Sequence, residues 1–199
     1  MKKVDKIKSH AAPLPMNDVD TDLIIPAQYL TSISKDGYGQ NLFQRLKEAD
    51  ANFVLTQEKF KKAEILVVDS NFGCGSSREH AVWALCDYGI KAVIAKSFAD
   101  IFFSNSSKNG LLTVILPEET VDKILKDSAK GNYEISIDLE KQTVTLPDGS
   151  QHTFPFDPFR KHCMLNGLDD IEYILSHAGD IKKFRAAQQA ERPFSTLGV

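Results

Sequence analysis

Two short runs of aliphatic residues, separated by a helical pattern, organise the middle of the chain. The runs lie at 65–68 (Ile-Leu-Val-Val) and 92–95 (Ala-Val-Ile-Ala), and continuous apolar runs of this length are typical of strands buried on both faces of a parallel sheet. Between them, Ala81, Val82, Ala84, Leu85 and Tyr88 fall on one face of a helix that Gly89 would end. The pattern predicts a βαβ unit, whose first turn lies at the carboxyl end of a parallel strand, where such sheets bind ligands.

Further helices are predicted on both sides of this unit. Residues 42–49 and 53–60 have the pattern of short helical pieces with exposed charges, and 98–103 predicts a short amphipathic helix that ends at the polar cluster 104–107. Helical spacing also predicts a helix at 118–129, and a strand at 111–116 precedes it.

The last third of the chain changes pattern twice. Apolar and polar residues alternate at 133–139, continue at 144–146 and resume after a turn at 147–149, which predicts an antiparallel meander that completes a barrel or second sheet. Asp157-Pro158 begins a helix that Gly167 ends, and Asp169 caps a further helix with a buried stripe of Ile171, Ile174 and Leu175. We therefore expect one α/β domain over 1–199, with 157–199 as a C-terminal helical extension.

Composition gives no indication of nucleic acid or a membrane as a partner. The chain has 199 residues, of which 42% are hydrophobic and 26% charged, and its net charge is only −3. This small charge gives no reason to expect binding to nucleic acid or to an anionic membrane. Since no apolar run approaches the ~20 residues of a membrane span and the start lacks the apolar core of a signal peptide, we expect a cytoplasmic protein.

The cysteines argue against a metal centre within this chain. The three cysteines Cys74, Cys86 and Cys163 are far apart in sequence, so they predict neither a disulfide framework nor a zinc site. Iron–sulfur clusters are usually held by runs that contain a C-x-x-C pair, which is absent here. We expect that this chain holds no cluster by itself.

The turn between the first strand and helix of the βαβ unit carries the candidate chemistry. Gly73 and Gly75 allow the backbone to bend sharply and to approach a ligand, and Ser76 or Ser77 would cap the helix so that its free N–H groups form an anion site. Arg78 adds a planar cation suited to a carboxylate or phosphate. A serine hydroxyl could act as a base here if helix-end donors and the guanidinium stabilise its alkoxide.

The residues of the turn do not match two other ligand-binding motifs that it resembles in part. A P-loop requires a lysine directly before the Ser or Thr, and a dinucleotide fingerprint requires a third glycine at the position of Arg78, so both fail. A thiol enzyme that pairs Cys74 with His80 remains open at this stage. A plain strand-to-helix connection is disfavoured because two glycines, two serines and an arginine occur together.

Four stretches together resemble a known family. The residues Asn71-Phe72-Gly73-Cys74-Gly75-Ser76-Ser77-Arg78-Glu79-His80-Ala81 resemble the signature of the swivelling domain of the aconitase superfamily, in the form found in the small subunits of bacterial 3-isopropylmalate dehydratases. The stretches 17–26, 97–102 and 159–169 are similar to that family's N-terminal, middle and C-terminal motifs. They stand in the family's order and cover most of the chain.

The resemblance implies a fold, a reaction and a partner. The implied fold is a swivelling β/β/α domain, and the implied reaction is the interconversion of 2-isopropylmalate and 3-isopropylmalate through isopropylmaleate in leucine biosynthesis. A separate large subunit would carry a [4Fe–4S] cluster whose iron acts as Lewis acid. The alternatives are a related hydro-lyase of the citraconate, methylmalate or homoaconitate type, and a regulatory module that binds anions without catalysis.

The resemblance also implies roles for individual residues. Ser76 would be the catalytic base, and Ser77 and Arg78 would bind a carboxylate of the small dicarboxylate substrate. Asp22, from the Thr21-Asp22 pair, would orient its neighbours in the substrate-binding shell. In the loop that follows, the uncharged Thr31 favours a substrate with an apolar arm, and Lys35 is a candidate for a second carboxylate contact, with a solvated lysine as the alternative.

Overall fold

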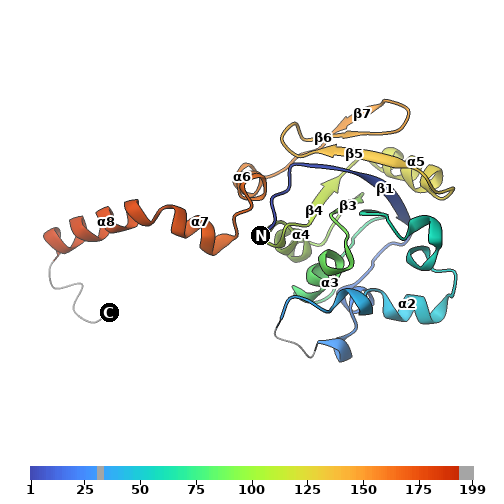
Figure 1. Cartoon of the computed structure of the whole chain (residues 1–199), viewed down its shortest axis with the longest axis horizontal. Coiled ribbons are helices and arrows are strands. Elements are labelled where there is room, and N and C mark those ends of the chain that lie inside the picture. Colours follow the sequence, from blue (N-terminus) through green and yellow to red (C-terminus); the bar gives the residue numbers. More distant parts are fainter. Residues whose placement is uncertain (31–33, 193–199) are drawn as a thin grey trace.

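One continuous sheet forms the body of the molecule (Figure 1). The structure is a computed structural model, and it describes residues 1–30 and 34–192. The strand order is β4-β3-β2-β1-β5-β6-β7. The parallel strands are β1 (Lys6–Leu14), β2 (Ile65–Val68), β3 (Ala92–Ala95) and β4 (Leu112–Ile115), and the antiparallel ones are β5 (Glu134–Asp138), β6 (Thr143–Thr145) and β7 (Gln151–Thr153). The expected α/β fold with a parallel core and a meander is confirmed.

The meander joins the parallel core through β1, and it does not form a separate sheet or barrel. Strand β1 has nine residues, and its first half pairs antiparallel with β5 while its second half pairs parallel with β2. A strand of this length can pair with one neighbour along its first half and with another along its second half. The parallel core and the meander are therefore parts of one continuous hydrogen-bonded sheet.

Helices cover both faces of the sheet and create two cores. Side chains of β2 alternate between them: Leu66 and Val68 lie in the core with α3 (His80–Tyr88), whereas Ile65 and Val67 lie in the core with α5 (Glu118–Ser128). All four side chains are fully buried, as the continuous apolar run predicts. The remaining helices of the body are α1 (Thr21–Ile24), α2 (Gln44–Ala49), α4 (Asp100–Asn109) and α6 (Pro158–Asn166), and short 3-10 turns lie at Ala27–Tyr29, Gly39–Asn41, Val54–Thr56 and Glu58–Phe60.

Helix α4 corrects one sequence expectation. The helix does not end at the polar cluster 104–107 but continues to Asn109, where Gly110 adopts the left-handed conformation. Two serines of the cluster are buried and donate hydrogen bonds back along the helix, from Ser106 Oγ to Phe102 O (2.8 Å) and from Ser107 Oγ to Ser104 O (2.9 Å). Because the helix itself satisfies these hydroxyls, they do not interrupt it.

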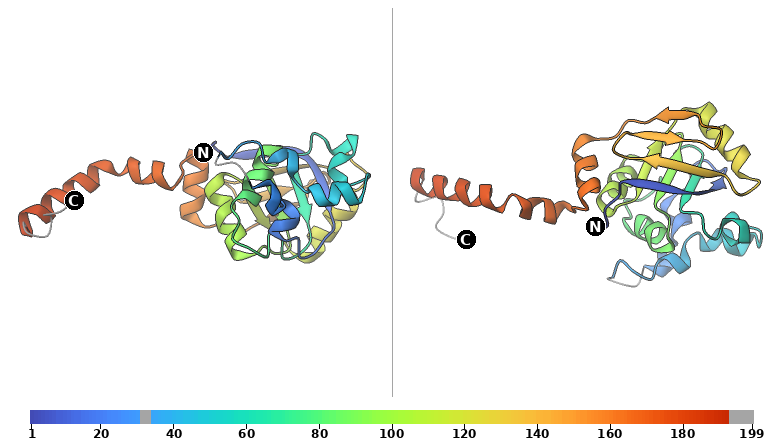
Figure 2. Two further views of the ribbon diagram at one scale, coloured as in Figure 1. Left: turned by 90° about the horizontal axis from the view of Figure 1, so that it is seen from below. Right: turned by 45° about the horizontal axis from the view of Figure 1, so that its top comes forward.

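The C-terminal helices α7 (Asp170–Ser176) and α8 (Ala178–Glu191) project from the body as an arm, which all views show (Figure 2). The capping role of Asp169 is confirmed, since Asp169 and Glu172 form a capping box. The expected buried stripe is wrong: Ile171, Ile174 and Leu175 are 69%, 56% and 65% exposed. Helical spacing predicted one apolar face correctly, but no described part of this chain packs against it. Helix α6, by contrast, buries Cys163 and Met164 against the body; the single-domain assignment, with 157–199 as an extension, stays a prediction.

Candidate active site

The glycine turn that follows β2 is fixed by one close approach and two backbone hydrogen bonds. Gly73 has φ +79°, and a Cβ at this position would lie 2.2 Å from the ring of Phe102, so only glycine fits. The turn is tied to the segment before α1 by hydrogen bonds from Gly73 N to Val19 O (2.8 Å) and from Thr21 N to Cys74 O (2.9 Å). Two segments far apart in sequence, the N-terminal motif and the signature turn, therefore form one unit.

Helix α3 begins later than the sequence suggests. Its first residue is His80, and Glu79 precedes it without a side-chain cap, so neither Ser76 nor Ser77 is the N-cap. The reason is that the chain first passes along α1, where Ser76 contacts Thr21, before it turns into the helix. Within the described residues, the backbone N–H groups of Ser77, Arg78 and Glu79 have no acceptor, so the donors expected of an anion site are present in this segment.

Thr21 holds the candidate base in place. The hydroxyls of Thr21 and Ser76 lie 3.0 Å apart, and Thr21 Oγ1 also lies 3.3 Å from both the N and the O of Ser76. Thr21 is only 2% exposed, whereas Ser76 is exposed. A rigid, buried hydroxyl thus positions a serine that a ligand can reach from outside.

Asp22, the next residue, binds two arginines. Its Oδ1 accepts a hydrogen bond from Arg78 Nη1 (2.6 Å) and its Oδ2 accepts one from Arg45 Nη1. The hydrogen bond from Arg78, the backbone N–H of Ala27 and the charge of Arg45 lower the pKa of the Asp22 carboxyl below its ordinary value of 3.8. Two consecutive residues of α1 thus bind two residues of the signature turn: Thr21 contacts Ser76, and Asp22 binds Arg78.

The lowered pKa of Asp22 predicts how stability depends on pH. The ionised carboxylate stabilises the fold fully above pH 3.8, its ordinary pKa, and this contribution is lost as the pH falls through the lower pKa of the folded state. We expect Asp22→Asn to lower Tm at pH 7 and to reduce the fall in Tm between pH 5 and pH 3. Thermal unfolding across this range checks the effect, with the exposed Glu140→Gln as control. A pH profile identical to that of the unchanged chain would contradict it.

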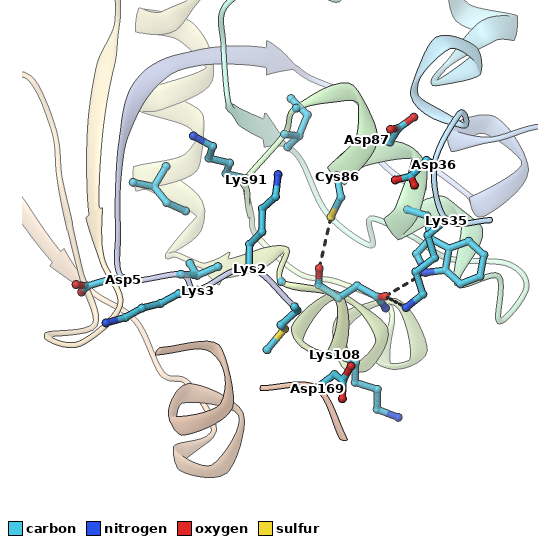
Figure 3. Close-up of a pocket in the computed structure, with 18 of the residues that line it drawn as sticks. Lys2, Lys3, Asp5, Lys35, Asp36, Cys86, Asp87, Lys91, Lys108 and Asp169 are labelled. Atoms are coloured by element: carbon cyan, nitrogen blue, oxygen red, sulfur yellow. Dashed lines mark hydrogen bonds between the residues drawn. The ribbon is translucent and has the colours of Figure 1, made fainter. Parts of the chain in front are cut away.

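The structure does not bring Lys35 to this group. Lys35 Nζ donates to Asn109 Oδ1 (2.9 Å) and lies 5.3 Å from the centre of the Trp83 ring, beside a groove of about 760 Å³ (Figure 3). Among the described residues that line the groove are the N-terminal residues 1–7 and the ends of α3 and α4, and the lining does not include Asp22, Ser76, Ser77 or Arg78. Thr31, the other position considered in this loop, lies outside the described residues.

The structure does not support a thiol enzyme that pairs Cys74 with His80. The ring of His80 packs against Trp83 (4.6 Å between ring centres) and Tyr38 (5.3 Å), and no contact joins it to Cys74 in the described part of the chain. Burial, together with the carboxylates of Asp20 and Asp18, raises the pKa of the Cys74 thiol. Since a nucleophilic cysteine requires a lowered pKa, Cys74 is a poor candidate.

The three cysteines, all of which lie in the part of the chain that the structure describes, do not fit an iron–sulfur cluster. Cys74 lies in the glycine turn, Cys86 in α3 and Cys163 in α6, and the pKa of Cys86 is raised by burial to about 11. Within residues 1–30 and 34–192, no cluster of three or more His, Cys, Asp or Glu side chains could hold a metal ion.

Arg45 is the functional candidate that sequence reasoning missed. It lies in α2, which the sequence marks only as a short helical piece with exposed charges. No spacing rule links it to Asp22, which precedes it by 23 positions. The weak signal available was an arginine in a segment otherwise rich in lysine and glutamate, because arginine is preferred where a carboxylate is held by a planar fork.

The fold and the site together define a swivelling domain of the aconitase type. The family model "Aconitase C-terminal domain" matches residues 1–119, and the model "LeuD_N" matches residues 122–158. None of the helices within residues 1–30 and 34–192 combines the length and the hydropathy that a membrane span requires.

The relatives make the assignment more specific. The chain is 49% identical over 189 residues to the 3-isopropylmalate dehydratase small subunit of Francisella tularensis subsp. novicida (strain U112), covering 95% of this chain and 100% of the relative. It is 48% identical to the small subunit of Dinoroseobacter shibae, covering 98% and 100%. A crystal structure of the 3-isopropylmalate dehydratase of Methanocaldococcus jannaschii superposes with a TM-score of 0.66 at 31% identity, covering 89% of this chain and 98% of that one. The chain belongs to the family of 3-isopropylmalate dehydratase small subunits, which are subunits of a hydro-lyase.

Proposed function

We propose that this chain supplies one half of the active site that interconverts 2-isopropylmalate and 3-isopropylmalate through isopropylmaleate, in leucine biosynthesis. The observation that carries the proposal is that two adjacent residues of α1, Thr21 and Asp22, hold the exposed hydroxyl of Ser76 and the guanidinium of Arg78. This arrangement supports a site with a proton acceptor and a carboxylate-binding cation, because each of the two groups is held by one of two consecutive residues. The family membership supports the same reaction.

Ser76 is the proposed base. As its alkoxide it takes the proton from the carbon next to a substrate carboxylate; the C–H electron pair becomes the double bond of isopropylmaleate, and the hydroxyl on the neighbouring carbon leaves with its bonding electrons as hydroxide. Thr21 Oγ1 lies 3.0 Å away, within reach to donate a hydrogen bond to the alkoxide. In rehydration, hydroxide adds to the carbon that lost its proton, and Ser76 gives the proton to the carbon that lost its hydroxyl, so the product is 3-isopropylmalate.

Arg78 and its neighbours are the proposed carboxylate site. Nη1 of Arg78 donates hydrogen bonds to Asp22 Oδ1 and to Ile25 O (3.5 Å). Within the described residues, Nε and Nη2 of Arg78 make no hydrogen bond, so they remain able to donate to a ligand. Those donors, the Ser77 hydroxyl and the unpaired N–H groups of 77–79 suit a carboxylate. Lys35 could contribute a second contact only after it leaves Asn109 and Trp83, so its role stays a prediction.

We further propose that the [4Fe–4S] cluster belongs to a separate large subunit, where it supplies Lewis-acid chemistry. The support is the name of the relatives as small subunits and the poor fit of this chain's own cysteines to a cluster. A cytoplasmic location, and the expectation of neither nucleic-acid nor membrane binding, stay predictions from the sequence.

A substrate panel tests the proposed function. We expect this chain mixed with its cluster-bearing large subunit to convert 2-isopropylmalate, with neither subunit active alone. Citraconate, methylmalate and homoaconitate should react at least about 100-fold less well in kcat/KM if the substrate assignment holds. Preference for one of these would show a related hydro-lyase, and an assembled pair that turned over neither 2-isopropylmalate nor any of the three alternatives would favour a binding module.

A further inference from the structure

Asp22 forms ion pairs with two arginines and not with one. Arg78 binds one carboxylate oxygen and Arg45 binds the other, so one negative charge lies between two positive ones. The three side chains come from three separate elements: the signature turn, α2 and α1. We call this set the Arg45–Asp22–Arg78 bridge.

The charge balance of the bridge depends on Arg45. Asp22 and Arg78 alone would sum to zero, and a neutral pair has little attraction for a substrate with two carboxylates. Two further carboxylates, Asp18 and Asp20, lie near the same turn, where both raise the pKa of Cys74. The bridge alone carries a charge of +1 with Arg45 and zero without it; with Asp18 and Asp20 counted, the local charge is −1 with Arg45 and −2 without it.

The geometry also leaves Arg45 outside the direct contacts of Ser76. Its side chain is 56% exposed, against 26% for Arg78 and 29% for Asp22, and its one hydrogen bond within the described residues goes to Asp22. Because Arg45 binds Oδ2 of Asp22 and Arg78 binds Oδ1, Arg45 can neutralise and orient the carboxylate without displacing Arg78.

We propose that Arg45 is a positioning residue for substrate binding. By binding Oδ2 of Asp22, it fixes that carboxylate and leaves the positive charge of Arg78 available to a substrate carboxylate. This inference rests on the proposed function and assigns the recognition of a dianionic substrate to a residue outside the family motifs. Arg45 acts on substrate binding, through Asp22 and Arg78, and not on proton transfer.

Kinetics of the two-subunit enzyme test the proposal. For Arg45→Met we expect KM for 2-isopropylmalate to rise about three- to thirtyfold, with kcat within about twofold of the unchanged enzyme, because one nearby charge is lost from the binding site alone. Arg45→Lys should recover part of the loss, since it keeps the charge but not the fork. Added salt should raise KM more in the unchanged enzyme than in Arg45→Met.

Lys47→Met is the matched control. Lys47 lies on the same helix and loses the same charge, but its ammonium lies over the Tyr88 ring (5.2 Å) and not on Asp22. Its KM should stay within about twofold of the original. The proposal is overturned if Arg45→Met keeps the original KM, if kcat falls instead, or if Lys47→Met raises KM equally. None of these outcomes contradicts the proposed function. The proposed function is contradicted if the two unsubstituted subunits together do not turn over 2-isopropylmalate.

Discussion

Replacing Ser76 with alanine should reduce kcat of the two-subunit enzyme by about 10²- to 10⁴-fold, the usual contribution of a positioned base. The protein should stay folded, because the change removes one hydrogen bond from Thr21, worth about 0.5–1.5 kcal/mol, and Thr21 Oγ1 keeps the carbonyl of Ser76 at 3.3 Å. KM should change little, since the carboxylate site is untouched. Steady-state turnover of 2-isopropylmalate, with co-elution of both subunits, measures these effects.

Ser104→Ala provides the matched control, because Ser104 is an exposed serine of α4 outside the site. It should leave kcat unchanged. If Ser76→Ala turned over substrate at the original rate, Ser76 would have no part in the mechanism. If it lost activity only because the subunits no longer assembled, the experiment would report on structure, which the co-elution detects.

Arg78→Lys should raise KM for 2-isopropylmalate about 10- to 100-fold, with a much smaller effect on kcat. A lysine keeps the charge, but its single ammonium cannot pair with Asp22 Oδ1 and also present two parallel donors to a substrate carboxylate. The loss corresponds to about 1.5–3 kcal/mol, which is typical of a hydrogen bond to a charged group.

The control for this change is Arg160→Lys, where an arginine in α6 makes an ion pair of the same length (2.6 Å) with Asp170. That substitution tests whether loss of an arginine fork alone affects the enzyme, and it should leave KM unchanged. An unaltered KM in Arg78→Lys would show that Arg78 serves only to hold Asp22.

Local patterns predicted the elements of the fold well. The continuous apolar runs of β2 and β3, the stop at Gly89 and the capping by Asp169 are all properties of a few neighbouring residues, and all are confirmed. The errors concern longer-range contacts. Ser76 and Ser77 have good capping chemistry, but Thr21, 55 positions earlier, binds Ser76 and delays the helix start.

The expectation of a buried stripe on α7 and the omission of Arg45 from the candidate residues are errors of the same kind. Apolar spacing indicates that a helix has a face for packing, but not whether that face packs within this chain. Likewise, the sequence shows that Arg45 is charged but not that Asp22 lies within its reach. The sequence therefore offered candidates where a motif marks them, at Ser76, Ser77 and Arg78 in one motif and Asp22 in another, but not Arg45, which lies outside both motifs and is linked to Asp22 only by the fold.

Proton release from labelled substrate tests the central claim most directly. The substrate carries tritium at the carbon whose proton Ser76 is proposed to remove, and the two-subunit enzyme is assayed for tritium released to water. We predict rapid release by the unchanged enzyme and, for Ser76→Ala, release slowed about 10²-fold or more while substrate still binds with a similar Kd. Release at the original rate by Ser76→Ala would contradict the account, because some other group would then accept the proton.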